Sequence, residues 1–113
     1  MAGPHILFVD DEEAIAQNAK SLLEPQGFTV SSYTDANQAL KADLSDISCL
    51  VLDWETPGMS GLKLYEEIQK KAGALPVIFI SGYDLTTDHP FLKKPFRFST
   101  LADLIRKEIR SRS

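Results

Sequence analysis

The sequence has no long apolar run, a single cysteine and no surplus of positive charge. No apolar run approaches the about 20 residues that a membrane-spanning helix needs, and the first residues lack the basic and apolar segments of a secretory leader. One cysteine excludes an internal disulfide, and Cys49 lies inside an apolar run, which predicts a small buried side chain. We therefore expect a cytoplasmic protein that does not enter a membrane.

Charge and length set two further bounds. A formal net charge of −4 disfavours nucleic acid as a direct partner, because a polyanion is attracted to basic surfaces. The 113 residues, of which 43% are hydrophobic, suit a single domain over residues 1–113 with its own hydrophobic interior.

Short apolar runs alternate with segments of helical spacing along the chain. Runs of this length, bounded by turn residues, are typical of strands that are buried on both faces of a parallel sheet. The alternation predicts an α/β fold with a parallel sheet. The expected strands cover residues 6–9, 28–33, 49–52, 77–80 and 91–93.

Helical segments separate most of these strands. The first one repeats apolar residues at helical spacing and stops at a proline and a glycine; its expected buried stripe is Ile15, Ala19, Leu22 and Leu23. The expected helices run from about Glu12 to Leu23, from a capping box at Asp35 to about Leu44, through Leu64, Tyr65 and Ile68 to near Gly73, and from a cap at Ser99 or Thr100 towards the end of the chain.

The segment between the last two strands is too short for the same pattern. A crossover between parallel strands normally needs about a dozen or more residues, whereas only Gly82 to His89 are left here, without an apolar stripe. We expect the fourth helix of the series to be absent or reduced to one turn, and the segment to be mobile.

Polar side chains follow the apolar runs at the point where each strand is expected to end. Asp10 and Asp11 follow the first strand, Asp53 the third, Ser81 the fourth and Lys94 the fifth. Because the carboxyl ends of parallel strands meet at one edge of a sheet, we expect these groups to converge there. Taken one at a time, an aspartate can simply cap a helix or start a turn, and a lysine can lie in solvent. The occurrence of such groups directly after four different strands favours a shared functional site over these separate explanations.

Three carboxylates in one place suit a magnesium ion, which prefers oxygen ligands. Asp11 and Asp53 are the expected direct ligands, Asp10 is expected to act through a water, and the backbone carbonyl of Glu55 is a further ligand. Without a cation the carboxylates repel one another, which should raise the pKa of at least one of them.

The same edge suits phosphoryl transfer. An aspartate carboxylate can attack phosphorus and form an acyl phosphate, and the transferring group carries negative charge on its oxygens. Asp53 is the expected nucleophile because it ends the predicted central strand and precedes an open turn. Lys94 and the Ser81 hydroxyl would contact the phosphoryl oxygens, and Gly82 would leave the phosphoryl position open.

This set of motifs resembles the receiver domain of two-component response regulators over nearly the whole chain. The residues that carry the resemblance are Val9-Asp10-Asp11-Glu12, Leu52-Asp53, Pro57-Gly58-Met59-Ser60-Gly61, Ile80-Ser81-Gly82 and Lys94-Pro95-Phe96. The resemblance implies a flavodoxin-like doubly wound five-stranded parallel sheet of order 2-1-3-4-5. The short segment after Ser81 and the run Phe79-Ile80-Ser81-Gly82-Tyr83 resemble a receiver subgroup with a degenerate fourth helix.

The resemblance also implies roles. Asp53 would be the phosphoacceptor, and its phosphoryl group would come from a sensor histidine kinase or a histidine phosphotransfer protein. Asp10 and Asp11 would bind Mg²⁺, Ser81 would be the switch hydroxyl, Lys94 would precede a cis bond to Pro95, and Phe91 would be the aromatic switch residue. Such a domain catalyses its own phosphorylation and dephosphorylation and is not a conventional turnover enzyme. It acts in signal transduction or a phosphorelay through a downstream protein partner, which the sequence does not identify.

Two alternatives stay open on the sequence alone. One is a pseudo-receiver that binds partners without phosphorylation. The other is a small aspartyl-phosphate phosphatase of the haloacid dehalogenase type, because Asp53-Trp54-Glu55-Thr56 resembles its Asp-x-Asp-x-Thr signature. Against the phosphatase, the second acid is a glutamate and the acidic pair lies upstream of the nucleophile.

Overall fold

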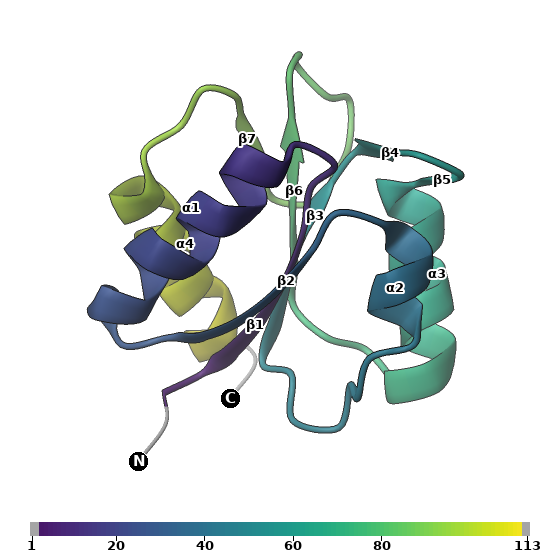
Figure 1. The fold of residues 1–113 in the computed structure, drawn as a ribbon, viewed down its shortest axis with the longest axis horizontal. Helices are drawn as coiled ribbons and strands as arrows, with labels where there is room; N and C mark the ends of the chain where they lie inside the picture. The colour runs from purple at the N-terminus through teal and green to yellow at the C-terminus, as the bar shows by residue number, and fades with distance from the viewer. Residues whose placement is uncertain (1–2, 112–113) are drawn as a thin grey trace.

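A computed structural model describes residues 3–111 as a parallel sheet between two helical layers (Figure 1). The strands of the sheet are β1 (His5–Val9), β2 (Thr29–Tyr33), β3 (Cys49–Asp53), β6 (Val77–Ser81) and β7 (Phe91–Lys93). They lie in the order β2-β1-β3-β6-β7, and every neighbouring pair is parallel. The predicted order 2-1-3-4-5 is confirmed, because the short strands β4 (Glu55–Thr56) and β5 (Met59–Ser60) form a separate antiparallel hairpin.

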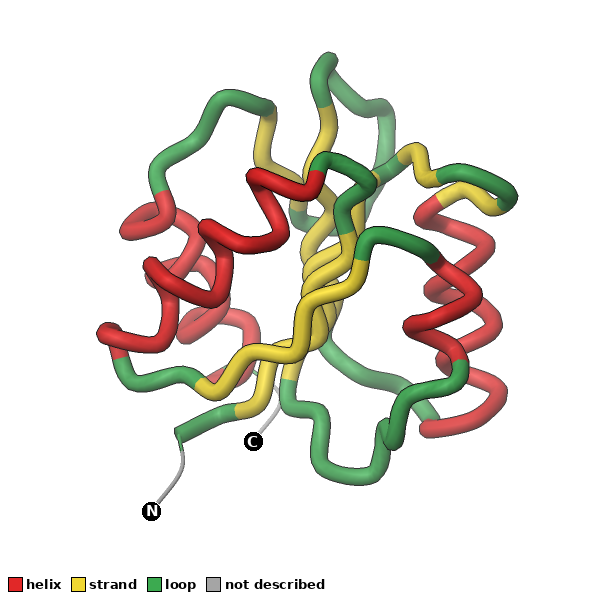
Figure 2. The backbone as a smooth tube through the Cα atoms, viewed as in Figure 1, coloured by secondary structure: helices red, strands yellow, loops and turns green. Residues whose placement is uncertain are grey.

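The helices cover both faces of the sheet, so the fold is doubly wound as predicted. Helices α1 (Glu13–Leu23) and α4 (Phe98–Arg110) lie on one side, and α2 (Ala36–Leu40) and α3 (Gly61–Ala72) on the other (Figure 1). Figure 2 shows the strands nearly edge-on between the two pairs of helices. Among the described residues, no helix has both the length and the apolar character that crossing a membrane requires.

The strand side chains alternate between two hydrophobic cores. Phe8 and Ile80 point to the core under α1 and α4, whereas Leu52 and Phe79 point to the core under α2 and α3. Every residue of β3 and β6 is buried, including Cys49 as predicted. Burial on both faces explains why these strands are continuous apolar runs in the sequence.

The first helix differs from the prediction in its buried face. Its buried residues are Ala16, Ala19 and Leu23, and Ile15 is partly buried. Leu22 is 49% exposed, so its place in the predicted stripe was wrong. Ala16 and Ala19 form the face of α1 that packs on the sheet, and Leu22 lies outside that face.

The second helix is shorter than predicted. The Asp35 carboxylate accepts hydrogen bonds from the backbone N–H groups of Asn37 and Gln38, which confirms the cap, but the helix ends at Leu40 instead of about Leu44. The chain then turns at Asp43, whose side chain accepts a hydrogen bond from the backbone N–H of Ser45. Such local bonds compete with helix formation.

The last helix begins earlier than predicted. It starts at Phe98, and Arg97 precedes it without a side-chain cap, so neither Ser99 nor Thr100 is the cap. The Phe98 ring contacts the Phe8 and Phe96 rings, with centroids 6.3 and 5.2 Å apart. This packing orders the first turn without a capping side chain.

Residues 82–90, all of them described, connect β6 to β7 without a helix, as predicted. His89 lies next to the end of the connection. Its ring packs edge-on against the rings of Tyr65 and Phe79, with centroids 5.3 and 5.5 Å apart. This aromatic cluster packs the connection against the α3 side of the sheet.

We predict that the amides of residues 83–89 exchange with deuterium far faster than those of β3 and β6 in the unliganded protein, because no helical hydrogen bonds protect them. Hydrogen exchange read by mass spectrometry or NMR tests this. Slow exchange across residues 83–89 would show that the connection is ordered by other means.

Gly61 marks a close approach between α3 and the end of β3. A Cβ at this position would lie 2.2 Å from the backbone oxygen of Asp53, and the Gly61 N–H donates to the Trp54 carbonyl at 2.8 Å. Gly61→Ala should lower the free energy of unfolding by about 1–3 kcal/mol, because backbone must move to admit the methyl group. Urea titration measures the change.

Gly82→Ala is the matched control for this change. A Cβ at Gly82 would meet nothing within 4 Å, so its substitution should alter stability by less than about 0.5 kcal/mol. Equal losses from both substitutions would mean that close packing is not what requires glycine at position 61.

Candidate functional site

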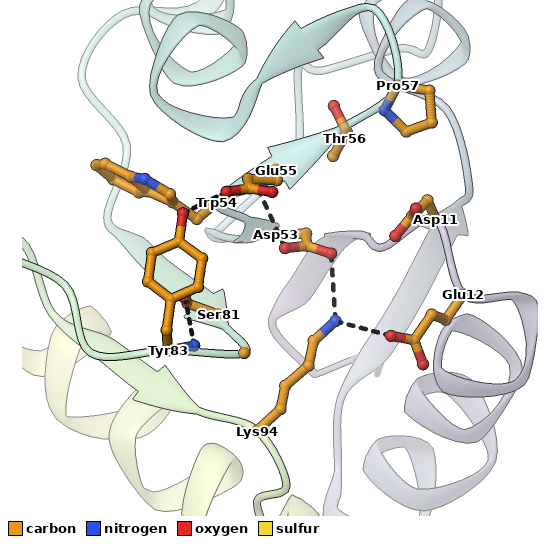
Figure 3. A pocket seen from close by; sticks show the side chains of 11 residues that line it. Asp11, Glu12, Asp53, Trp54, Glu55, Thr56, Pro57, Ser81, Tyr83 and Lys94 are labelled. Atoms are coloured by element: carbon orange, nitrogen blue, oxygen red, sulfur yellow. Dashed lines mark hydrogen bonds and ion pairs between the residues drawn. The ribbon is translucent and has the colours of Figure 1, made fainter.

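The side chains predicted to converge do meet at one edge of the sheet. Asp10 follows β1, Asp53 and Ser81 are the last residues of β3 and β6, and Lys94 follows β7. They surround a pocket of about 450 Å³ that Asp11, Asp53, Ser81 and Lys94 help to line (Figure 3). Asp10 is fully buried next to this pocket.

Three carboxylates form the acidic part of the pocket. Asp10, Asp11 and Asp53 each place one oxygen within 4.8 Å of the others. Asp10 and Asp53 are buried, whereas Asp11 is exposed to the pocket. A set of three carboxylate oxygens, two of them on buried residues, suits a hard divalent cation.

Lys94 compensates part of this negative charge. Its Nζ lies 2.9 Å from Asp10 Oδ2, 3.2 Å from Asp53 Oδ2 and 3.5 Å from Glu12 Oε1. The contact with Asp10 is a close ion pair, and within residues 3–111 no group other than Lys94 engages the buried Asp10 Oδ2. Asp10 Oδ1 accepts from the backbone N–H of Glu12. One buried oxygen therefore keeps the capacity to bind a cation.

The pKa values of the buried carboxyls reflect this environment. Burial raises the pKa of Asp53 to about 6, and the Asp10 carboxylate adds to the rise. The backbone N–H of Glu55 and the Lys94 ammonium oppose it. Burial also raises the pKa of Asp10, whereas the adjacent carboxylates raise the pKa of Lys94 above its ordinary value. The predicted rise is present, but its first cause is burial and not repulsion between carboxylates.

Ser81 and Glu55 are both held by Tyr83. The buried Ser81 Oγ accepts the backbone N–H of Tyr83 at 3.1 Å, and the Tyr83 hydroxyl donates to the Glu55 carboxylate (Figure 3). The Glu55 carboxylate is thus engaged by Tyr83 and lies outside the three-carboxylate cluster. The expectation for Glu55 concerned its backbone carbonyl and stays a prediction.

Sequence reasoning missed part of the pocket wall. The open turn after Asp53 was predicted, but not the hairpin of β4 and β5 that forms it, in which the Thr56 hydroxyl donates to the Met59 carbonyl. The hydrogen bond between Tyr83 and Glu55 was also missed. The two residues lie far apart in the chain, and only their shared position two residues beyond a strand end could have paired them.

One further expectation is met, since the peptide bond between Lys94 and Pro95 is cis. Trp54 packs edge-on against Phe79, with ring centroids 4.9 Å apart, and lines the pocket beside Asp53. Phe91 is partly buried against the core under α2 and α3.

The raised pKa of Asp53 predicts how stability depends on pH without metal. Between about pH 4 and pH 6 the folded protein binds more protons than the unfolded chain, so this group's contribution lowers stability as pH rises. Asp53→Asn removes the effect, and should stabilise the protein relative to wild type by about 1–3 kcal/mol more at pH 7.5 than at pH 4. Urea titrations in the presence of a chelator measure the difference.

Asp43→Asn is the control of opposite sign. Hydrogen bonds from Ser45 lower the pKa of Asp43, so its carboxylate stabilises the fold above that pKa, and its loss should cost more as pH rises. If the difference in free energy of unfolding between Asp53→Asn and wild type did not change with pH, the pKa of Asp53 in the folded protein would be ordinary.

Comparison with known proteins adds the family. The family model of the response regulator receiver domain matches residues 6–106. Among curated proteins, the chain is 33% identical to the regulatory protein VanR of Enterococcus faecium over 93% of its length. It is 31% identical to the C4-dicarboxylate transport transcriptional regulatory protein DctD of Rhizobium meliloti over 94% of its length. The chain spans 49% of the first and 25% of the second.

Solved structures give the same result. The receiver domain of the hybrid histidine kinase CckA superposes with a TM-score of 0.83 and 35% identity, covering 93% of this chain and 98% of that one. A response regulator receiver domain from Clostridium thermocellum superposes with a TM-score of 0.86 and 26% identity, covering 96% of each chain. Fold, family match and relatives agree, and the chain belongs to the response regulator receiver domains of two-component signalling.

Proposed function

We propose that this chain accepts a phosphoryl group on Asp53 from a phosphohistidine of a sensor histidine kinase or a histidine phosphotransfer protein. The observation that carries the proposal is the placement of the Asp53 carboxylate in a pocket with two other carboxylates and Lys94. Receiver domains act as phosphoacceptors and not as conventional enzymes. For this chain, catalysis of its own phosphorylation and dephosphorylation is part of the proposal.

The donor set fits a magnesium ion. Asp10, Asp11 and Asp53 would hold it, with the backbone carbonyl of Glu55, and within the described residues the buried Asp10 Oδ2 is engaged by Lys94 alone. Bound Mg²⁺ would supply positive charge to the oxygens of the transferring group.

The residues of the chain provide the remaining chemistry. An oxygen of the ionised Asp53 carboxylate attacks phosphorus and forms an acyl phosphate, while the phosphorus–nitrogen bond of the donor breaks. The Lys94 ammonium, now paired with Asp53 Oδ2 at 3.2 Å, donates to a phosphoryl oxygen. Ser81 Oγ accepts a hydrogen bond from the Tyr83 N–H, and its own O–H donates a hydrogen bond to another phosphoryl oxygen.

Phosphorylation would then shift a two-state equilibrium. Ser81 and Phe91 lie at the two ends of residues 82–90, so a change at the Ser81 hydroxyl would reach Phe91 through that connection. The connection holds no helix, so we infer that a downstream protein partner does not bind through a helix between β6 and β7. The curated relatives are longer than this chain, and their outputs do not identify its partner.

The central test is phosphorylation by a small donor. The protein with Mg²⁺ and acetyl phosphate should gain one phosphoryl group, seen by intact-mass spectrometry, and Asp53→Asn should gain none. Asp84→Asn removes an exposed carboxylate that pairs with Lys93 and lines no part of the pocket, and should be phosphorylated as wild type. An Asp53→Asn protein phosphorylated at the wild-type rate would refute the assignment.

The same preparation separates the alternatives. Failure to bind Mg²⁺ at millimolar concentration, together with no phosphorylation, would favour a module that binds partners without phosphorylation. Steady hydrolysis of phosphomonoesters without a partner would favour a phosphatase.

A further inference from the structure

We propose that the Ser31 hydroxyl is a second reactive group of this protein, which accepts an acyl group from activated acyl donors such as acyl phosphates and thioesters. His5 acts as its general base, and Asp46 is a positioning residue for the His5 ring. None of these three residues lines the acidic pocket, so the proposal does not depend on phosphorylation of Asp53.

A hydroxyl, an imidazole and a carboxylate from three segments form one chain of hydrogen bonds. His5 is the first residue of β1, Ser31 lies in the middle of β2, and Asp46 lies in the loop before β3. His5 Nε2 is 2.7 Å from Ser31 Oγ, and His5 Nδ1 is 3.2 Å from Asp46 Oδ1. A nucleophile within hydrogen-bond reach of a base, whose other nitrogen is held by a third group, is the arrangement that activates serine in acyl transfer.

The carboxylate determines which nitrogen of the neutral His5 ring carries the hydrogen. A carboxylate accepts hydrogen bonds and donates none, so the bond to Asp46 requires the hydrogen on Nδ1. Nε2 then offers a lone pair, and the Ser31 hydroxyl donates to it. The Ser31 O–H is therefore directed at the nitrogen that takes its proton during the reaction.

The backbone also fixes where the imidazole lies. Leu7 pairs with Ser31 across β1 and β2, and His5 is two residues before Leu7, so both polar side chains lie on the same face of the sheet. The His5 N–H donates to Ser48 Oγ at 3.1 Å, and the His5 carbonyl accepts from the Ser48 N–H at 2.7 Å. The base is thus positioned by strand pairing on one side and by the loop on the other.

A small acyl donor can reach the group from solvent. The His5 side chain is 19% exposed, the Asp46 side chain is 73% exposed, and Ser31 is half-buried. β2 is an edge strand, and within residues 3–111 no strand of the sheet lies beyond it. The hydroxyl is therefore held against its base without being sealed in the core.

The proposed step is an acyl transfer. Ser31 Oγ attacks the carbonyl carbon of the donor, its proton passes to His5 Nε2, and the Asp46 carboxylate stabilises the imidazolium that forms. The bond between the acyl carbon and the leaving group breaks, and the leaving group departs with the electron pair. The imidazolium then returns its proton to the solvent, and an ester remains on Ser31.

The test uses p-nitrophenyl acetate as the donor and the whole protein, followed by digestion with trypsin and mass spectrometry. Trypsin releases residues 21–41 as one peptide, whose single lysine is its last residue. Ser32 lies in the same peptide on the opposite face of β2 and is the internal reference. Ser31 should be acetylated at least about tenfold faster than Ser32, because a general base contributes about 10²–10⁴-fold.

Two variants separate activation from a merely structural role. His5→Gln keeps a polar side chain but removes the base, and should bring the ratio of the Ser31 rate to the Ser32 rate close to one. Asp46→Asn changes an exposed side chain and removes its charge, and should lower the ratio about threefold or more with little change in the urea midpoint. The matched control is Asp84→Asn, an exposed aspartate paired with Lys93 of β7, which should keep the wild-type ratio.

Equal labelling of Ser31 and Ser32 in the wild type would overturn the proposal. An undiminished ratio in His5→Gln would also overturn it, because the hydrogen bonds of His5 would then only join β1 to β2 and to the loop. If His5→Gln did not fold, Asp46→Asn would decide, and an unchanged ratio in that variant would refute the role of His5 as an oriented base. None of these outcomes bears on the role of Asp53.

Discussion

The burial of two carboxylates around one ammonium is the interaction on which the rest of the site depends. Asp10 and Asp53 lie at the carboxyl ends of adjacent strands, and Lys94 reaches both from beyond β7. The parallel register of the sheet brings the three groups together, because each one ends a strand or directly follows it. One ammonium cannot satisfy two buried carboxylates and an exposed third, so the pocket keeps an excess of negative charge. That excess is what makes the site suitable for a cation.

The same arrangement costs stability in the absence of a cation. Burial disfavours the ionised form of Asp53, whose pKa is raised to about 6. A protein that needed only to fold would place apolar or neutral residues here. Carboxyl groups with raised pKa values are common at reactive sites. The fold tolerates the free energy that such a buried charge costs, because the surrounding core stabilises it. In this chain the two fully buried strands β3 and β6 supply it.

Most of the fold and the charged half of the site could be predicted from the sequence. The strands β3 and β6 are buried on both faces, so their sequences are apolar without interruption, and the acidic and hydroxyl residues stand directly after them. What failed depended on contacts between distant segments. Phe98 begins α4 and packs on Phe8, and the Glu55 carboxylate accepts a hydrogen bond from the Tyr83 hydroxyl. No local pattern in the sequence indicates either contact. The shorter α2 was missed because the Asp43 turn competes with the helix signal that precedes it.

The register of β6 and β7 has a consequence for how a signal leaves the site. Ser81 pairs with Lys93 and Phe79 pairs with Phe91, so both ends of the connection are neighbours in the same sheet. Residues 82–90 are therefore anchored at both ends to paired strands. Under the proposed function, a partner that distinguishes the two states would contact residues 82–90, which begin directly after Ser81 at the pocket.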